Sequence, residues 1–96
     1  MEKFEKLMEE IDEEMEGAEH YAKKACDMRD RDSHAATIYN EMAVQEMGHA
    51  ENLHRMLKDH VAAMPEEHRK MMEPVMEWAE RRLSRWEDKI KHKLKH

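Results

Sequence analysis

The chain has 96 residues, of which 42% are charged and only two each are glycine and proline, so one all-α domain spanning residues 1–96 is expected. Its formal charge of −6 argues against general binding to nucleic acids or anionic membranes, which cationic surfaces drive. The single cysteine, Cys26, excludes an intrachain disulfide and a thiolate metal centre. Without an apolar signal region or a membrane-spanning run, a soluble cytoplasmic protein is expected.

The first helix is predicted over residues 2–28, a segment that has no proline and a single glycine, Gly17. Apolar residues recur there at steps of three and four, the spacing that lines one face of a helix. These positions are Phe4, Leu7, Ile11, Ala18, Tyr21, Ala25 and Met28. One face of this helix should therefore be buried.

A polar run over residues 29–33 interrupts this pattern and predicts a turn. Asp32 or Ser33 can cap the next helix, because either side-chain oxygen can accept from a free backbone N–H group. The second helix is predicted over residues 34–61, and the apolar positions in and just after it are Ala35, Tyr39, Met42, Leu53, Met56 or Leu57, and Met64. A connection this short makes the two helices antiparallel, as a helical hairpin.

The third helix is predicted over residues 65–94. Pro65 suits its first position, where the missing N–H group costs nothing. Pro74 lies within the segment, removes a backbone hydrogen bond and clashes with the carbonyl of Lys70. The helix is therefore expected to kink or restart between Met71 and Pro74, with a break near Pro74.

Strict heptad spacing passes through ionisable residues in the first two helices. Positions 7, 11, 14, 18, 21 and 25 include Glu14, and positions 35, 39, 42, 46, 49 and 53 include Glu46 and His49. All three lie at similar distances from the turn, so their side chains should converge. Buried carboxylates are costly unless they are paired, hydrogen-bonded or bound to a metal. The pattern therefore predicts a metal site.

Glu46 and His49 have the Glu-x-x-His spacing, which places a carboxylate and an imidazole on adjacent turns of one helix face. Ferritin-like di-iron bundles use one Glu from each of two helices and one Glu-x-x-His from each of the other two. This chain offers one of each, so a homodimer would complete the set and form a ferritin-like four-helix bundle. Carboxylate oxygen and imidazole suit iron, with manganese as the alternative.

Two segments resemble the encapsulated ferritins, short ferritin-like proteins whose protomers are helical hairpins. They are residues 13–21 (EEMEGAEHY) and 46–50 (EMGHA), and the resemblance covers roughly residues 8–57. It implies that Glu14, Glu46 and His49 ligate iron at a dimer interface, and that acidic residues beside the centre, here Glu13 and Glu16, bind incoming metal.

The resemblance also implies an encapsulin-type shell as a partner. The sequence departs from the family at His20, where a tryptophan is typical, and shows no evident encapsulin-targeting tail. A homodimer or a higher homo-oligomer is expected.

The predicted function is that of a ferroxidase, which oxidises Fe(II) with dioxygen or peroxide. One alternative is a di-iron or di-manganese oxidase or peroxide scavenger, and another is a metal-stabilised or metal-free helical interaction module that works through the third helix. Tyr21 and Tyr39 lie at matching heights and could pack in the core or stand beside the metal. A second Glu-x-x-His, Glu51 and His54, lies off the predicted seam and is expected to be exposed.

Overall fold

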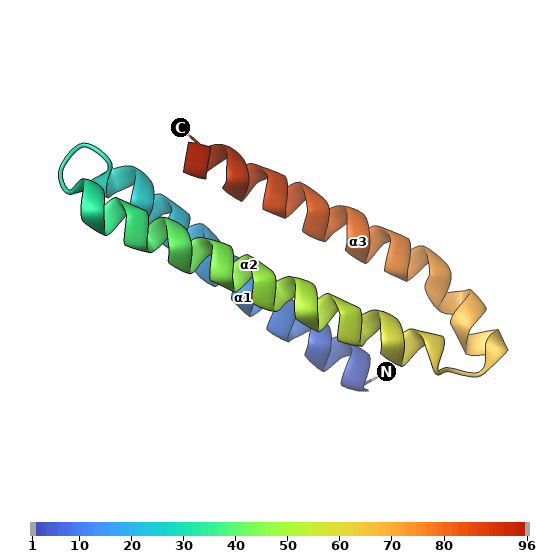
Figure 1. Cartoon of the computed structure of the whole chain (residues 1–96). Helices are drawn as coiled ribbons and strands as arrows, with labels where there is room; N and C mark the ends of the chain where they lie inside the picture. Colours follow the sequence, from blue (N-terminus) through green and yellow to red (C-terminus); the bar gives the residue numbers. More distant parts are fainter. Residues whose placement is uncertain (1, 96) are drawn as a thin grey trace.

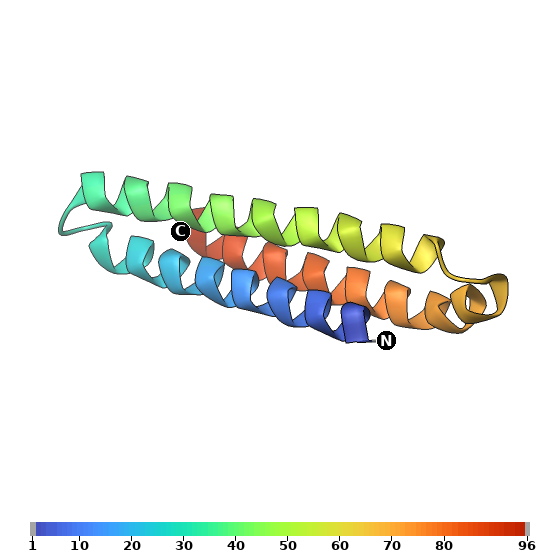
Figure 2. The same ribbon diagram turned by 90° about the horizontal axis from the view of Figure 1, so that it is seen from below.

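Residues 2–95 are described by a computed structural model and form three helices and no strand. The helices are α1 (Glu2–Met28), α2 (Ser33–Ala62) and α3 (Glu66–Lys95). Figures 1 and 2 show α1 and α2 as an antiparallel hairpin, with α3 returning along it, so that the C-terminus lies toward the α1–α2 turn. The molecule measures 55 × 18 × 14 Å, and none of these helices is long and apolar enough to cross a membrane. The all-helical prediction is confirmed.

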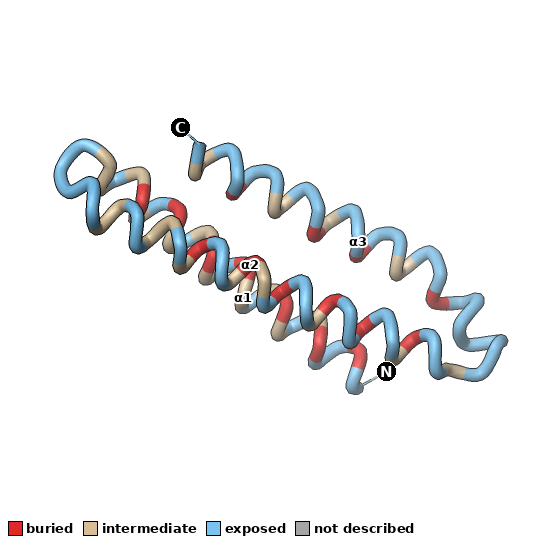
Figure 3. Tube along the Cα trace, viewed as in Figure 1, coloured by how far each residue is buried: buried red, intermediate tan, exposed pale blue. Residues whose placement is uncertain are grey.

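The hairpin is held together by small residues. Five alanines, Ala18, Ala22, Ala25, Ala43 and Ala50, are buried on the facing sides of α1 and α2. Short side chains let two helix axes approach closely, and larger residues then fill the space on either side. Met15 and Leu57 are fully buried there, and Phe4, Leu7 and Ile11 continue the core toward the end of α2. The tube in Figure 3 shows the buried positions of α1 and α2 turned toward each other.

The predicted seam of α2 is wrong in register. The buried residues of this helix are Ala43, Met47, Ala50, His54, Leu57 and Val61, whereas the predicted positions 35, 39, 42, 46 and 53 are only half-buried and His49 is exposed. In α1 the apolar residues of the prediction lie in or beside the core, but Met15 takes the buried place assigned to Glu14. The ionisable residues therefore flank the core of the single chain.

The predicted helix ends agree with the structure to within one residue. Asp32 caps α2, since its Oδ1 accepts from the backbone N–H of Ala35 at 3.1 Å. Pro65 was predicted at the first position of the third helix, but it lies directly before α3, which begins at Glu66. Its carbonyl oxygen accepts from the N–H of Arg69 at 2.9 Å.

The predicted restart of the helix near Pro74 is wrong, because α3 continues through this residue. Proline leaves the carbonyl of Lys70 without its helical partner. Lys70 and Pro74 are both exposed, so water can satisfy that carbonyl and the helix can continue. The first turns of α3 bend relative to the rest of it, as Figure 1 shows, which agrees with the alternative prediction of a kink.

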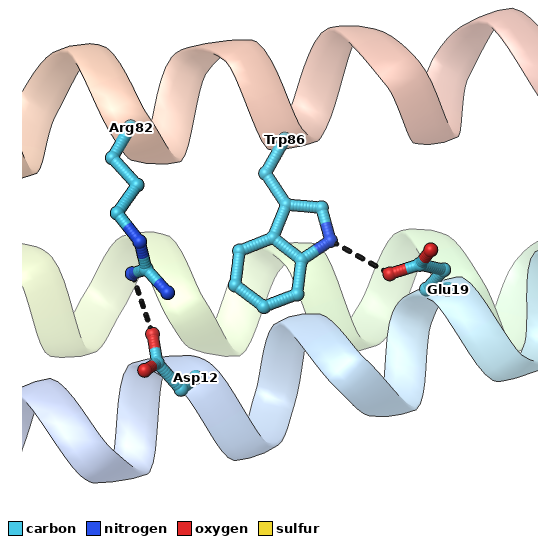
Figure 4. A network of polar contacts seen from close by, with 4 residues as sticks. All are labelled: Asp12, Glu19, Arg82 and Trp86. Atoms are coloured by element: carbon cyan, nitrogen blue, oxygen red, sulfur yellow. Dashed lines mark hydrogen bonds and ion pairs between the residues drawn. The ribbon is translucent and has the colours of Figure 1, made fainter.

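Polar contacts fix α3 along one side of α1. Asp12 accepts from Arg82 at 2.6 Å, and Glu19 accepts from the Trp86 indole N–H at 3.0 Å, as Figure 4 shows. Arg82 also lies over the Trp86 ring, 5.1 Å from its centroid. Asp12 and Glu19 are seven residues apart, which is two helical turns, so they face the same side. This side of the hairpin is the one that α3 covers.

Two carboxyl groups meet where α3 approaches α2. Burial is the main cause that raises the pKa of Glu87 to about 7, and a hydrogen bond with Glu51 is the second cause. A raised pKa means that the folded state favours the protonated carboxyl. Glu87 therefore contributes its full stabilisation of the folded state at pH values below 4.5, its ordinary pKa. That contribution is lost as pH rises through about 7.

We therefore expect the metal-free Glu87→Gln variant to have a higher free energy of unfolding than the wild type at pH 8. The difference should vanish near pH 4, where Glu87 is protonated in both states. Urea unfolding at the two pH values in the presence of a chelator measures this. Equal stabilities at pH 8 would show that Glu87 carries no raised pKa.

Candidate metal centre

The hairpin brings Glu14, Glu46 and His49 together. Each offers a ligand atom, and the three atoms lie within 4.8 Å of one another. The closest contact joins His49 Nδ1 and Glu14 Oε2 at 3.3 Å. Among residues 2–95 this is the only group of three or more histidine, cysteine or acidic side chains with that spacing. The predicted convergence of these three residues is therefore confirmed, although the predicted seam is not.

The cluster lies on the side of the hairpin away from α3. Successive residues of an α-helix are turned by about 100°, so Asp12, which contacts α3, and Glu14 point about 200° apart. The Glu14 and His49 side chains are 30% and 59% exposed. One chain thus presents the cluster on an open face with room for further ligands.

A shallow groove of about 480 Å³ surrounds the cluster, and its lining clarifies the predicted entry site. Glu13 lines it, but Glu16, although exposed, is not among its lining residues. Glu10 also lines it and was missed by the sequence analysis, although it lies four residues before Glu14 and hence one turn away on the same face. The acidic approach to the cluster therefore consists of Glu10 and Glu13.

The two carboxylates of the cluster interact directly. A hydrogen bond with Glu14 raises the pKa of Glu46, and burial and the negative charge of Glu14 act in the same direction. His49 opposes them through its charge. Two carboxylates this close favour holding a proton between them, and a bound cation would release it.

Gly17 leaves the space in which the Glu46 carboxylate lies. A Cβ atom on Gly17 would stand 3.2 Å from Glu46 Oε2 and 3.6 Å from its Cδ. Gly48, in α2, has nothing within 4 Å of such an atom. A Cβ atom at position 17 would thus contact a ligand of the site, whereas one at position 48 would meet open space.

Replacing either glycine by alanine should stabilise its helix by about 0.5–1 kcal/mol, since glycine has the greater backbone freedom to lose. Gly48→Ala should raise the melting temperature and leave metal affinity unchanged. Gly17→Ala should displace the Glu46 carboxylate and weaken metal binding. Calorimetric titration of both variants with Mn²⁺ measures this, and equal affinities would show that Glu46 does not ligate from this position.

Tyr21 and Tyr39 lie side by side across the hairpin. Their ring centroids are 6.2 Å apart and the rings are stacked at 22°. Both residues are half-buried, and the stacking of their rings confirms their matching heights. The stacking favours packing as their structural role, and a place beside the metal stays a prediction for both.

The geometry provides two carboxylates and one imidazole on the open face of a helix pair. Such a donor set holds Fe(II), Mn(II) or Zn(II) and leaves coordination positions free. Comparisons with family models, curated proteins and solved structures give no match for this chain.

Proposed function

We propose that the chain is a ferroxidase that oxidises Fe(II) at a di-iron centre shared between two copies. The observation that carries this proposal is the convergence of Glu14, Glu46 and His49 within 4.8 Å. A single chain gives three ligands, which is half of the set used by ferritin-like di-iron bundles. A second copy related by a two-fold axis would supply the other half.

Apolar side chains on the same face support this dimer. Ile38 and Met56 are large apolar residues of α2 whose exposed fractions are 43% and 52%. Ile38 lies eleven residues before His49 and Met56 seven after it, so both point within about 20° of it around α2. Association through this face would bury them and bring two clusters together, leaving α3 of each copy on the outside.

In the proposed reaction Fe(II) is the substrate. Each of two Fe(II) ions gives one electron, and dioxygen takes both electrons and two protons to form hydrogen peroxide. Glu14 and Glu46 would hold the ions through oxygen and favour Fe(III), because anionic ligands stabilise the higher charge. His49 would supply the nitrogen ligand, and Glu10 and Glu13 would attract incoming cations. An encapsulin-type shell remains a proposed partner for collecting the product.

Aerobic Fe(II) addition tests this function. A ferroxidase oxidises many Fe(II) ions per dimer, at a rate well above that of iron in buffer. A structural metal site binds a fixed number of ions and then stops, and a metal-free interaction module leaves the buffer rate unchanged. Either of the last two results would overturn the proposal.

A further inference from the structure

A second Glu-x-x-His motif faces the opposite side of α2. Glu51 and His54 were expected to be exposed, but His54 is 9% exposed and lies against α3. The prediction is confirmed for Glu51, which is exposed, and wrong for His54, because it considered only the α1–α2 hairpin. The motif lies off the predicted seam yet on the face that α3 covers.

His54 has a buried nitrogen without a partner. Its Nε2 is inaccessible to solvent and makes no hydrogen bond in the described part of the chain. Burial is also the main cause that lowers the pKa of His54, which favours the neutral imidazole. A neutral ring nitrogen with a free lone pair is the form that binds metal ions.

Carboxylates from α3 meet this histidine in one groove of about 520 Å³ between the two helices. Glu80 and Glu87 line it from α3, opposite Glu51 and His54. Glu51 and Glu87 are close enough to share a hydrogen bond, and Glu80 is near enough to His54 to act on its charge. Three carboxylates thus line the same groove as one unpartnered imidazole.

We propose that Glu51, His54 and Glu87 form a second binding site for a divalent transition metal ion, between α2 and α3. Glu51 and His54 would chelate from adjacent turns of α2, and Glu87 would bind from α3. Their donor atoms are spread more widely than those of the first cluster, so binding draws them together. The exposed Glu51 can turn on its flexible stem, and Glu80 offers a further oxygen.

This site would fasten α3 to the hairpin. The α3 helix packs less extensively on α1 and α2 than these two pack on each other. Residues of both α2 and α3 would bind this metal ion, so the complete site exists only when α3 is docked on the hairpin. Metal binding therefore favours the docked state. Metal binding between α2 and α3 requires neither iron oxidation nor a dimer.

The test uses the full chain with the first site removed by Glu14→Ala and His49→Ala, two residues outside the buried core. Calorimetric titration with Zn²⁺ should show one ion bound per chain. Adding Glu51→Gln or Glu87→Gln should weaken binding at least about tenfold, and these neutral replacements also remove the repulsion between the two carboxylates. Circular dichroism confirms folding of each variant.

Two exposed carboxylates serve as matched controls, Glu41→Gln in α2 and Glu77→Gln in α3, and neither should change Zn²⁺ affinity. A chain without the first site that binds no Zn²⁺ would overturn the proposal. Equal affinity in the Glu51, Glu87 and control variants would also overturn it, since the ion would then be bound elsewhere. Neither result bears on Fe(II) oxidation, which is measured separately with the first site intact.

Discussion

His49→Ala should abolish rapid Fe(II) oxidation while the protein stays helical. His49 supplies the one imidazole of the cluster, and its side chain is 59% exposed, so its removal takes away a ligand without opening a cavity in the core. Replacing residues that only support a metal ligand often costs 10–100-fold, so losing the ligand itself should cost about 100-fold or more in rate. Stopped-flow absorbance after mixing with Fe(II) and oxygen measures the loss.

The matched control is His34→Ala, because His34 is an exposed histidine near the start of the same helix. Its oxidation rate should equal that of the wild type. Circular dichroism should give the same helix content for both variants. Wild-type oxidation by the His49 variant would remove this residue from the site, whatever the fold does.

Metal binding should strengthen association of the chain with itself. If each chain holds half of the ligands, the complete site exists only in the dimer, and metal favours that state by mass action. A divalent ion at one hundred times its dissociation constant would contribute about 2.7 kcal/mol, or roughly a hundredfold in the dimer dissociation constant. Sedimentation velocity with and without Mn²⁺ measures the shift.

Glu14→Ala should weaken this metal-driven association. The same change should strengthen the metal-free dimer, because four carboxylates would otherwise face one another across the interface. Glu9→Ala is the control, since Glu9 is an exposed carboxylate on the far side of α1 and should leave both constants unchanged. Identical dissociation constants with and without metal would mean that the carboxylates do not bridge the interface.

The sequence predicted the helices well because their signals are local. A period of three and four residues, an aspartate cap and a short polar turn define α1 and α2 without reference to the rest of the chain. The effect of Pro74 on the continuity of α3 could not be predicted from such local signals. Whether a proline breaks a helix depends on whether water can reach the carbonyl that loses its hydrogen bond. This depends on which face of α3 packs against the hairpin.

The register of α2 required tertiary information. Strict heptad spacing selected a seam through Glu46 and His49. Packing against two neighbours instead buries a stripe that contains two alanines and a histidine, made of Ala43, Met47, Ala50, His54, Leu57 and Val61. Alanine is a weak hydrophobic signal, and a histidine within the stripe disguises it further. The convergence at Glu14 was predictable even so, since height along a hairpin depends on distance from the turn rather than on register.

Anomalous diffraction from crystals grown with Fe(II) or Mn²⁺ tests the shared centre most directly. The proposal predicts two metal ions on or symmetrically about a two-fold axis, held by Glu14, Glu46 and His49 of both copies. Ions bound by a single chain at this cluster would contradict the shared site. So would a crystal in which Glu46 and His49 face solvent with no metal between them.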